Sequence, residues 1–224
     1  KFYPWARKFF FFFNKMTLLC AANQISKSST QIRKCIDWAT NQKKWPTLWR
    51  RRPFQFWYLY PTKEVATIEF QKKWLTEFMP RGEFEHDKIY GWKVEYRARE
   101  IFAVHFNSGV TVYFKAYSQD VQHLQTGTCD AIFCDEELPE DLYDELNLRT
   151  AATDGYFHMV FTATLGQQFW ADAIEGKGFV EKFPDALKLQ VSMFDCLKYE
   201  DGSPSHWTAE RIQKIVNSCR SQNE

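Results

Sequence analysis

Short, nearly continuous apolar runs recur along the chain and predict buried strands. A further segment, 100–117, alternates apolar and polar residues on either side of Asn107-Ser108-Gly109, which predicts a β-hairpin. The apolar runs are MTLLCAA (16–22), FQFWYLYP (54–61), CDAIFCDEE (129–137) and GYFHMVFTATLG (155–166), and LKLQVSMFDC (187–196) is expected to be the last strand.

Apolar residues at helical spacing follow most of these runs. Ile32, Ile36 and Ala39 predict a helix after the first strand, and Thr62 can cap a helix over 63–79. Pro139 opens another helix, and a last one is expected over 208–219. Strands that alternate with helices predict an α/β fold with a largely parallel central sheet flanked by helices, plus an antiparallel hairpin.

The run FFFFF at 9–13 predicts a short buried helix that packs on several sides. It is too short to span a bilayer, and no signal peptide precedes it, so we expect no membrane contact. The chain has 224 residues, enough for one large domain or one domain with a small appendage.

Charge and cysteine content add little to this picture. The net charge is +1, but the first hundred residues are rich in Lys and Arg and the remainder in Asp and Glu. This asymmetry could mark a basic face for a polyanion and an acidic region around a metal, or opposite charges that meet within the fold. Six scattered cysteines without a C-x-x-C pattern predict a reducing compartment and no structural zinc.

The stretch AANQISKSST (21–30) lies between the first predicted strand and helix and has the outline of a phosphate-binding loop. Lys27 and Ser28 occupy the Lys-Ser/Thr positions of G-x-x-x-x-G-K-[ST], but Ala21 and Ser26 replace both glycines. Such a loop holds phosphate by backbone N–H groups at a helix N-terminus, adds a lysine charge, and offers a hydroxyl to magnesium. The alternative is a solvated Lys-Ser pair at a helix start.

An acidic pair ends the third predicted strand, where Asp135 and Glu136 follow AIFC. Because ligand sites lie at the carboxyl ends of parallel strands, Lys27 and Ser28 are expected to meet this pair there. Asp135 could hold magnesium, and Glu136 could accept a proton from the attacking water. The alternative is an ordinary acidic helix start.

The next strand ends in Thr162, Ala163 and Thr164. Hydroxyl groups at this position can sense the γ-phosphate and transmit its loss to neighbouring elements. A strand end before a glycine turn explains the same residues.

In order and content these segments resemble the ATPase domain of the large terminase subunit, the motor that packages DNA into tailed-phage capsids. The resemblance covers nearly the whole chain, from FYPW and AANQISKSST through WYLYPTKEVATIEFQKKWL and YSQDVQHLQTGTCDAIFCDEE to LNLRTAATDGYFHMVFTATLG. It implies an additional-strand, catalytic-glutamate (ASCE) P-loop fold that uses ATP and Mg²⁺ to move double-stranded DNA as a homo-oligomeric ring. It also implies the portal protein and the terminase small subunit as partners, in the host cytoplasm.

The resemblance assigns roles to particular residues. Lys27 and Glu136 would be catalytic, Ser28 and Asp135 would hold magnesium, and Thr162 to Thr164 would couple hydrolysis to movement. Tyr3, Pro4 and Trp5 would lie near the adenine. The nucleotide-binding residues would be Tyr3, Trp5, Ala22, Asn23, Gln24, Ile25, Ser26, Lys27, Ser28 and Ser29.

Two positions depart from the family pattern. Ser26 stands where the family has glycine; if positive φ is needed there, a Cβ costs roughly 1–3 kcal/mol or displaces the loop. Asn23 stands where many terminases carry an arginine finger, so the finger must come from elsewhere. Arg149 is the first candidate and the cluster 50–52 the second; an arginine that merely caps an acidic helix is the alternative.

DNA contacts and domain limits complete the expectations. Lys43, Lys44, Arg50, Arg51 and Arg52, interleaved with tryptophans, suit phosphate contact, although a solvated loop is the favoured interpretation. We expect an ATPase core over 1–195 and a small lid or linker over 196–224. The linker would lead to a nuclease domain outside this chain.

Two other functions remain open. A superfamily 2 helicase or remodelling ATPase shares the same motifs but needs a second motor lobe. A nucleotide-binding assembly module with hydrolysis impaired at Ser26 is the alternative that is not an enzyme.

Overall fold

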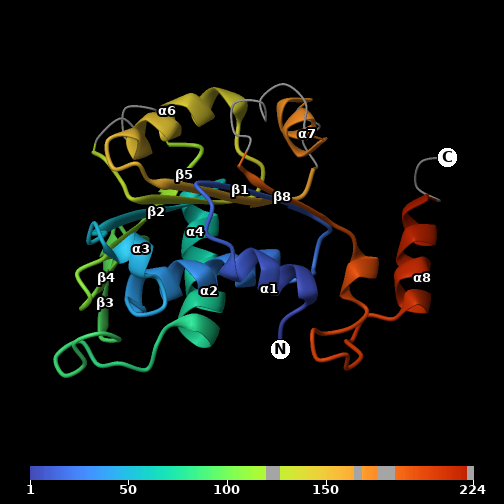
Figure 1. Cartoon of the computed structure of the whole chain (residues 1–224), viewed down its shortest axis with the longest axis horizontal. Helices are drawn as coiled ribbons and strands as arrows, with labels where there is room; N and C mark the ends of the chain where they lie inside the picture. Colours follow the sequence, from blue (N-terminus) through green and yellow to red (C-terminus); the bar gives the residue numbers. More distant parts are fainter. Residues whose placement is uncertain (120–126, 164–167, 176–184, 221–224) are drawn as a thin grey trace.

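The computed structural model describes residues 1–119, 127–163, 168–175 and 185–220, and its centre is an eight-stranded sheet (Figure 1). The strands lie in the order β3-β4-β5-β2-β6-β7-β1-β8. Their bounds are β1 (Met16–Ala21), β2 (Gln55–Tyr60), β3 (Trp92–Arg97), β4 (Glu100–Phe106), β5 (Thr111–Ala116), β6 (Ala131–Asp135), β7 (Tyr156–Phe161) and β8 (Leu187–Val191).

Six neighbouring strands, from β5 to β8 in the sheet order, pair in parallel, and β3 and β4 extend the sheet by antiparallel pairing. The largely parallel sheet and the hairpin between β4 and β5 confirm the predicted α/β class. Strand β7 lies between β1 and β6, so one additional strand separates the phosphate-loop strand from the strand that ends in acid.

Helices cover both faces of the sheet (Figure 1). The helices α6 (Glu140–Ala151) and α7 (Gln168–Glu175) lie on one face. The other face carries α1 (Pro4–Phe11), α2 (Lys27–Thr40), α3 (Pro46–Trp49) and α4 (Lys63–Glu69), which continues into the π-helical segment η1 (Phe70–Phe78). The chain ends in a 3₁₀ turn, η3 (Met193–Cys196), and α8 (Ala209–Arg220).

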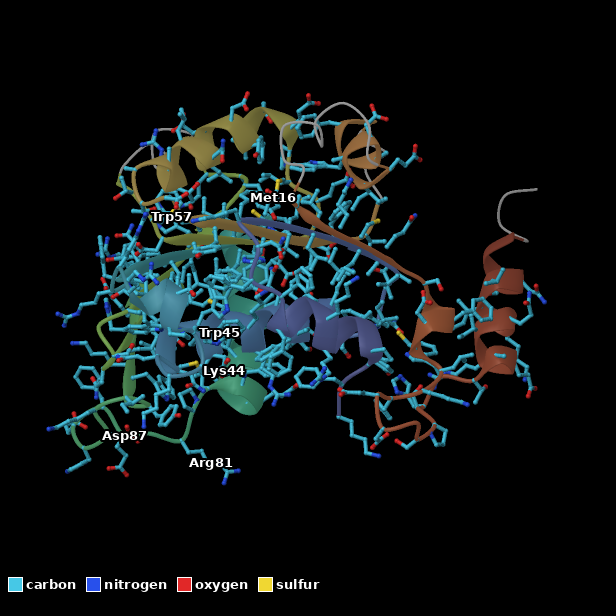
Figure 2. The ribbon with its side chains drawn as sticks, viewed as in Figure 1. Met16, Lys44, Trp45, Trp57, Arg81 and Asp87 are labelled. Atoms are coloured by element: carbon cyan, nitrogen blue, oxygen red, sulfur yellow. The ribbon has the colours of Figure 1, made fainter. Side chains whose placement is uncertain are left out.

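Each face has its own apolar core. Met16 and Trp57 belong to the core under α6 and α7, whereas Trp45 belongs to the core under α2 and α3 (Figure 2). A third cluster joins α1 to β1, β8 and the C-terminal segment through Trp5, Leu189 and other apolar residues. Strands buried on both faces explain why their sequences read as continuous apolar runs.

Several local expectations can be compared with these elements. The Thr62 hydroxyl accepts a hydrogen bond from the N–H of Val65 at 3.2 Å, which confirms the predicted cap of α4. The phenylalanine run is helical only to Phe11, and Phe11 and Phe12 are exposed, so the expectation of burial on several sides was wrong for these two rings. No helix among the described residues is long and apolar enough to cross a membrane.

Candidate functional site

The loop between β1 and α2 is anchored by a backbone hydrogen bond to β8 and by one buried side chain. Ala22 donates from its backbone N–H to the carbonyl of Val191 at 3.0 Å, and the Ile25 side chain is fully buried. Gln24 and Ser26 adopt positive φ values of 61° and 72°. Within the described residues no group accepts a hydrogen bond from the N–H groups of residues 23–28, so these donors are available to an anion at the start of α2.

Lys27, the first residue of α2, directs its ammonium into the space between three elements. Its Nζ lies 2.5 Å from Thr162 Oγ1 at the end of β7 and 3.3 Å from Asn23 Oδ1 in the loop. It also lies 3.6 Å from Glu136 Oε1, after β6. The parallel order β6-β7-β1 brings these strand ends together, as expected for the carboxyl edge of such a sheet.

Asp135, the last residue of β6, is buried beside the start of α2. Its Oδ1 accepts a hydrogen bond from Ser28 Oγ at 2.8 Å, and its Oδ2 accepts one from the Tyr58 hydroxyl at 3.1 Å. Burial raises the pKa of this carboxyl to about 6; the hydrogen bonds from Ser28 and Tyr58 oppose that rise, and the charge of Glu136 adds to it.

Glu136 has a strained backbone and an accessible side chain. Its φ is 80°, its N–H donates to the carbonyl of Val160 at 2.8 Å, and its side chain is 44% exposed. The Tyr117 hydroxyl donates to the carbonyls of Asp135 and Glu136 at 3.1 and 2.9 Å. This fixed turn lets the buried carboxylate and the accessible one face different parts of the site.

Thr162 connects β7 to the loop. Its hydroxyl donates to the carbonyl of Ala21 or to Asn23 Oδ1, at 3.1 and 2.8 Å, while it accepts from Lys27. Ala163 follows at an exposed position, and Thr164, the third predicted coupling residue, lies outside the described residues. The strand end is therefore in direct contact with the lysine of the loop.

The oxygen atoms of Ser28 and Asp135 fit a magnesium ion. Mg²⁺ prefers hard oxygen ligands and commonly takes one or two carboxylates, with substrate phosphates and water completing its coordination. A hydroxyl and a carboxylate 2.8 Å apart supply such a partial set. Among the described residues no group of three or more His, Cys, Asp or Glu could hold a metal by itself.

A pocket of about 270 Å³ opens beside the loop, between the N-terminal segment, α2, η1 and the C-terminal segment. Ser26 and Ser29 lie on its loop side, and the rings of Phe2, Tyr3 and Tyr199 line another side. Tyr3 and Trp5 are both buried, but only Tyr3 lines this pocket; the indole of Trp5 donates to Cys196 Sγ at 3.3 Å. Aromatic walls next to a loop of free N–H donors suit a nucleoside joined to phosphates.

The candidate finger Arg149 lies away from this site in its own chain. Its carbonyl accepts from the N–H of Cys129, just before β6 begins, and its Nη2 lies 2.5 Å from Glu145 Oε1. Since α6 starts at Glu140 near the site, Arg149 is about 14 Å further along the helix axis. The structure thus places Arg149 at the amino edge of the sheet, away from the Lys27 site of its own chain.

The proposed DNA contacts also lie outside the site. Arg51 Nη1 lies 3.6 Å from Asp154 Oδ2 at the amino edge of the sheet, and Lys44 Nζ lies 2.9 Å from Asp37 Oδ2. Lys43, Arg50 and Arg52 are exposed. Lys44 therefore lies beside the last turn of α2, and Arg51 lies at the edge of the sheet opposite the loop.

Three polar residues of the site were not predicted from the sequence: Gln31, Tyr58 and Tyr117. Gln31 is buried one turn after Lys27 on the same helix face, and a polar residue in that position was the available signal. Tyr58 and Tyr117 read as ordinary strand aromatics, and no sequence pattern marked them.

The strand order, the loop at a helix N-terminus and the acidic strand end together define a P-loop domain of the α/β class. Residues 24–224 match the family described as terminase large subunit, T4likevirus-type, N-terminal. The chain therefore belongs to this family, as the resemblance indicated. No curated protein matches the chain.

Solved structures with the same fold come from phage terminases. The ATPase domain of the large terminase of a Thermus phage, solved as a mutant, has a TM-score of 0.56 and 16% identity, over 85% of this chain and 81% of that one. The large terminase of a thermophilic bacteriophage, in complex with ADP, has the same TM-score and identity, over 90% of this chain and 45% of that one. These likenesses confirm the terminase ATPase fold, and this chain spans less than half of the second protein.

Proposed function

We propose that this chain is an ATP-hydrolysing motor domain that moves double-stranded viral DNA into a preformed capsid. The observation that carries the proposal is that the loop and the acidic strand end meet at one edge of the sheet. There Ser28 Oγ lies 2.8 Å from Asp135 Oδ1, and Lys27 Nζ lies 3.6 Å from Glu136 Oε1. Membership of the terminase large-subunit family supports the motor role, and the ADP bound to a protein of the same fold supports the nucleotide.

Each residue has a distinct task in this proposal. The N–H groups of residues 23–28 and the Lys27 ammonium would neutralise the phosphates. Ser28 and Asp135 would hold Mg²⁺, which supplies charge neutralisation at the phosphate oxygens. Glu136, accessible and next to Lys27, would accept the proton of the attacking water. The nucleoside would occupy the aromatic pocket beside Tyr3.

Arg149 can serve such a site only in a neighbouring subunit. It lies at the amino edge of its own sheet, so a head-to-tail ring could bring it to the next subunit's phosphates. An arginine that acts in trans also fits a loop in which Asn23 replaces the family's arginine.

The remaining parts of the proposal concern partners and organisation. The exposed cations Lys43, Arg50 and Arg52 would contact DNA phosphates, with the portal protein and the terminase small subunit as further partners in the host cytoplasm. Residues 1–195 would form the ATPase core, and residues 196–224 a lid or linker. Thr162 and Ala163, with Thr164, would transmit hydrolysis to these parts, because Thr162 contacts both Lys27 and the loop.

One observation favours a second candidate function, a nucleotide-binding assembly module with impaired hydrolysis. Ser26 occupies the left-handed conformation that the family supplies with glycine. Phosphate release by the parent and by Ser26→Gly separates the two candidates. Turnover in the parent supports the motor, turnover only in Ser26→Gly indicates a motor impaired by serine, and turnover in neither favours the module.

The central test compares two variants of the site. Lys27→Ala should weaken ATP binding at least tenfold, because it removes the phosphate-binding cation. Glu136→Ala should keep ATP affinity within about threefold while phosphate release falls at least a hundredfold, because it removes only the proton acceptor. Equilibrium binding of a fluorescent ATP analogue and a steady-state phosphate assay give the two readouts.

Asp141→Ala is the matched control, because Asp141 is an exposed acidic residue in the first turn of α6. It should leave both readouts unchanged. Equal losses from Asp141→Ala and Glu136→Ala would mean that the acidic pair merely starts a helix. A loss of binding in Glu136→Ala as severe as in Lys27→Ala would contradict the assigned roles.

A further inference from the structure

Tyr58 is a buried tyrosine on β2, and it contacts the site through its hydroxyl group. Strands β2 and β6 are parallel neighbours with Tyr58 opposite Phe133, so Tyr58 and Asp135 lie on the same face of the sheet, the one that α2 covers. The hydroxyl donates to Asp135 Oδ2 at 3.1 Å, and the Tyr58 side chain is 0% exposed.

The two oxygen atoms of Asp135 have different partners. Ser28, the candidate magnesium hydroxyl, contacts Oδ1 at 2.8 Å, whereas Tyr58 contacts Oδ2 from the interior. A carboxylate held by one oxygen from behind presents the other oxygen in one direction, because rotation about its Cβ–Cγ bond would break the hydrogen bond. Tyr58 therefore fixes the orientation in which the carboxylate faces Ser28.

The orientation of Tyr58 is itself fixed. The amide of Gln31 donates to the Tyr58 oxygen at 3.4 Å and to the carbonyl of Cys134 at 2.9 Å, which ties α2 to β2 and β6. The Tyr58 ring stacks on Phe133, with ring centres 6.0 Å apart, and meets Trp74 edge-on at 5.0 Å. These contacts leave the hydroxyl one position relative to Asp135.

We propose that Tyr58 is a positioning residue for the magnesium site, holding Asp135 so that Oδ1 faces the metal together with Ser28. The inference rests on the proposed function, because it concerns the metal that accompanies ATP. Groups that orient metal ligands in this way typically contribute ten- to hundredfold to metal affinity. Tyr58 touches neither the phosphates nor the attacking water, so its effect is confined to metal-dependent binding.

Tyr58→Phe tests the inference, since it removes the hydroxyl and keeps the ring. Tyr156→Phe is the matched control: Tyr156 is a buried tyrosine at the start of β7, at the edge of the sheet opposite the loop, and its ring meets Trp38 edge-on at 5.1 Å. Binding of a fluorescent ATP analogue is measured over a Mg²⁺ titration and again with excess chelator. Thermal unfolding of each variant without nucleotide gives the purely structural effect.

Tyr58→Phe should raise the Mg²⁺ concentration for half-maximal binding at least tenfold, leave binding in chelator unchanged, and unfold within a few degrees of Tyr156→Phe. An equal shift in both variants, or none in Tyr58→Phe, would overturn the inference while the proposed function stands. A parent chain that binds no ATP analogue would overturn the proposed function, and the inference with it. If Tyr58→Phe does not fold, Gln31→Leu, which frees the Tyr58 hydroxyl, must give the Mg²⁺ shift; otherwise the inference is wrong.

Discussion

At the scale of single residues, Ser26 shows how the loop tolerates the loss of its glycine. The residue keeps the left-handed conformation with φ 72°, and Gln24 in the same loop has φ 61°. Of the two expected consequences, strain or displacement, the positive φ of Ser26 corresponds to strain. Left-handed backbone at a residue with a Cβ costs on the order of 1 kcal/mol.

Ser26→Gly should accordingly raise the free energy of unfolding by about 0.5–1 kcal/mol, because relief of strain exceeds the extra freedom of glycine in the unfolded chain. Urea denaturation without nucleotide measures the change. Ser26→Ala keeps the Cβ and loses only the hydroxyl, so it should match the parent. A gain of the same size in Ser26→Ala would trace the effect to the hydroxyl group and not to the backbone.

His158, fully buried in β7, is a second residue with a specific expected effect. Within the described part of the chain both ring nitrogens lack a hydrogen-bond partner, and the ring stacks on Phe133 at 5.3 Å and meets Trp38 edge-on at 4.9 Å. Burial, and then the charge of Lys34, lowers the pKa of His158 well below its usual value. Since the unfolded chain binds a proton near pH 6.5 and the folded chain does not, stability is present above pH 6.5 and is lost as the pH falls below it.

His158→Phe should keep the ring packing, and it removes both the unsatisfied ring nitrogens and the loss of stability at low pH. We expect it to stabilise the fold by about 1–3 kcal/mol at pH 8, because two unsatisfied polar atoms disappear. Below pH 6.5 its advantage should grow by up to about 1.4 kcal/mol per pH unit. Denaturation of the parent and His158→Phe between pH 5 and pH 8 measures the difference in their free energies of unfolding, and the contributions of other titrating groups cancel in that difference. If the difference does not change with pH, the imidazole is hydrated or paired in the folded protein.

At the scale of secondary-structure elements, Lys34 joins α2 to the end of α1. Its ammonium donates to the carbonyls of Phe9 and Phe12, at 2.8 and 2.7 Å, where a helix leaves carbonyl groups without intrahelical partners. The side chain is fully buried, and burial lowers the pKa of Lys34. This lysine is therefore a helix cap supplied by another helix.

Lys34→Met should destabilise the fold by roughly 2 kcal/mol or more, because methionine has a similar length but leaves two carbonyls without a donor. Relief of the buried charge offsets part of that loss. Lys8→Met, at an exposed position on α1, should change stability by less than about 0.5 kcal/mol. Urea denaturation gives both changes in the free energy of unfolding, and faster proteolysis of Lys34→Met within residues 1–15 would show that α1 is the element that loosens. If Lys34→Met is as stable as the parent, burial of the lysine charge costs as much free energy as the cap contributes.

Some strands and helices could be predicted from the sequence, and others could not. Continuous apolar runs identified β1, β2, β6 and β7, because a strand buried on both faces has no polar side. The edge strand β8 shows instead an alternation of apolar and polar residues, LKLQV. Strand β3 was not predicted: half of its residues, WKVEYR, are charged, and it exists because β4 offers an open edge to pair with. The π-helical geometry of η1 also left no sequence signal, and α3 has only four residues.

For the site, sequence reasoning succeeded where a motif fixes both chemistry and position. The loop and the acidic pair could be placed at one edge because each follows a parallel strand directly. Tyr58 required the strand order, since only the pairing of β2 with β6 brings it to Asp135. The position of Arg149 likewise required the structure, because the length and direction of α6 carry it away from the strand end where the helix begins.

At the scale of the whole molecule, the N-terminal segment meets the segment between η3 and α8 beside the site. The Tyr3 and Tyr199 rings stack with centres 5.1 Å apart, the N–H of Glu200 donates to the carbonyl of Phe2 at 2.9 Å, and Arg7 pairs with Glu200 at 2.8 Å. Tyr199 and the loop residue Ser26 line the same pocket. A ligand in that pocket would therefore touch the loop, the N-terminal segment and the C-terminal segment at once.

Tyr199→Ala should consequently weaken ATP binding about tenfold, the equivalent of one lost aromatic contact of roughly 1–1.5 kcal/mol. Binding of inorganic tripolyphosphate should not change, because the loop and Lys27 remain intact. Tyr90→Ala, at an exposed tyrosine before β3, should leave both affinities unchanged. Competition against a fluorescent ATP analogue measures the affinities of both ligands in one assay. An equal loss of affinity for ATP and tripolyphosphate would mean that Tyr199 supports the loop and does not contact the nucleoside. No loss of affinity for either ligand would place the nucleoside outside this pocket.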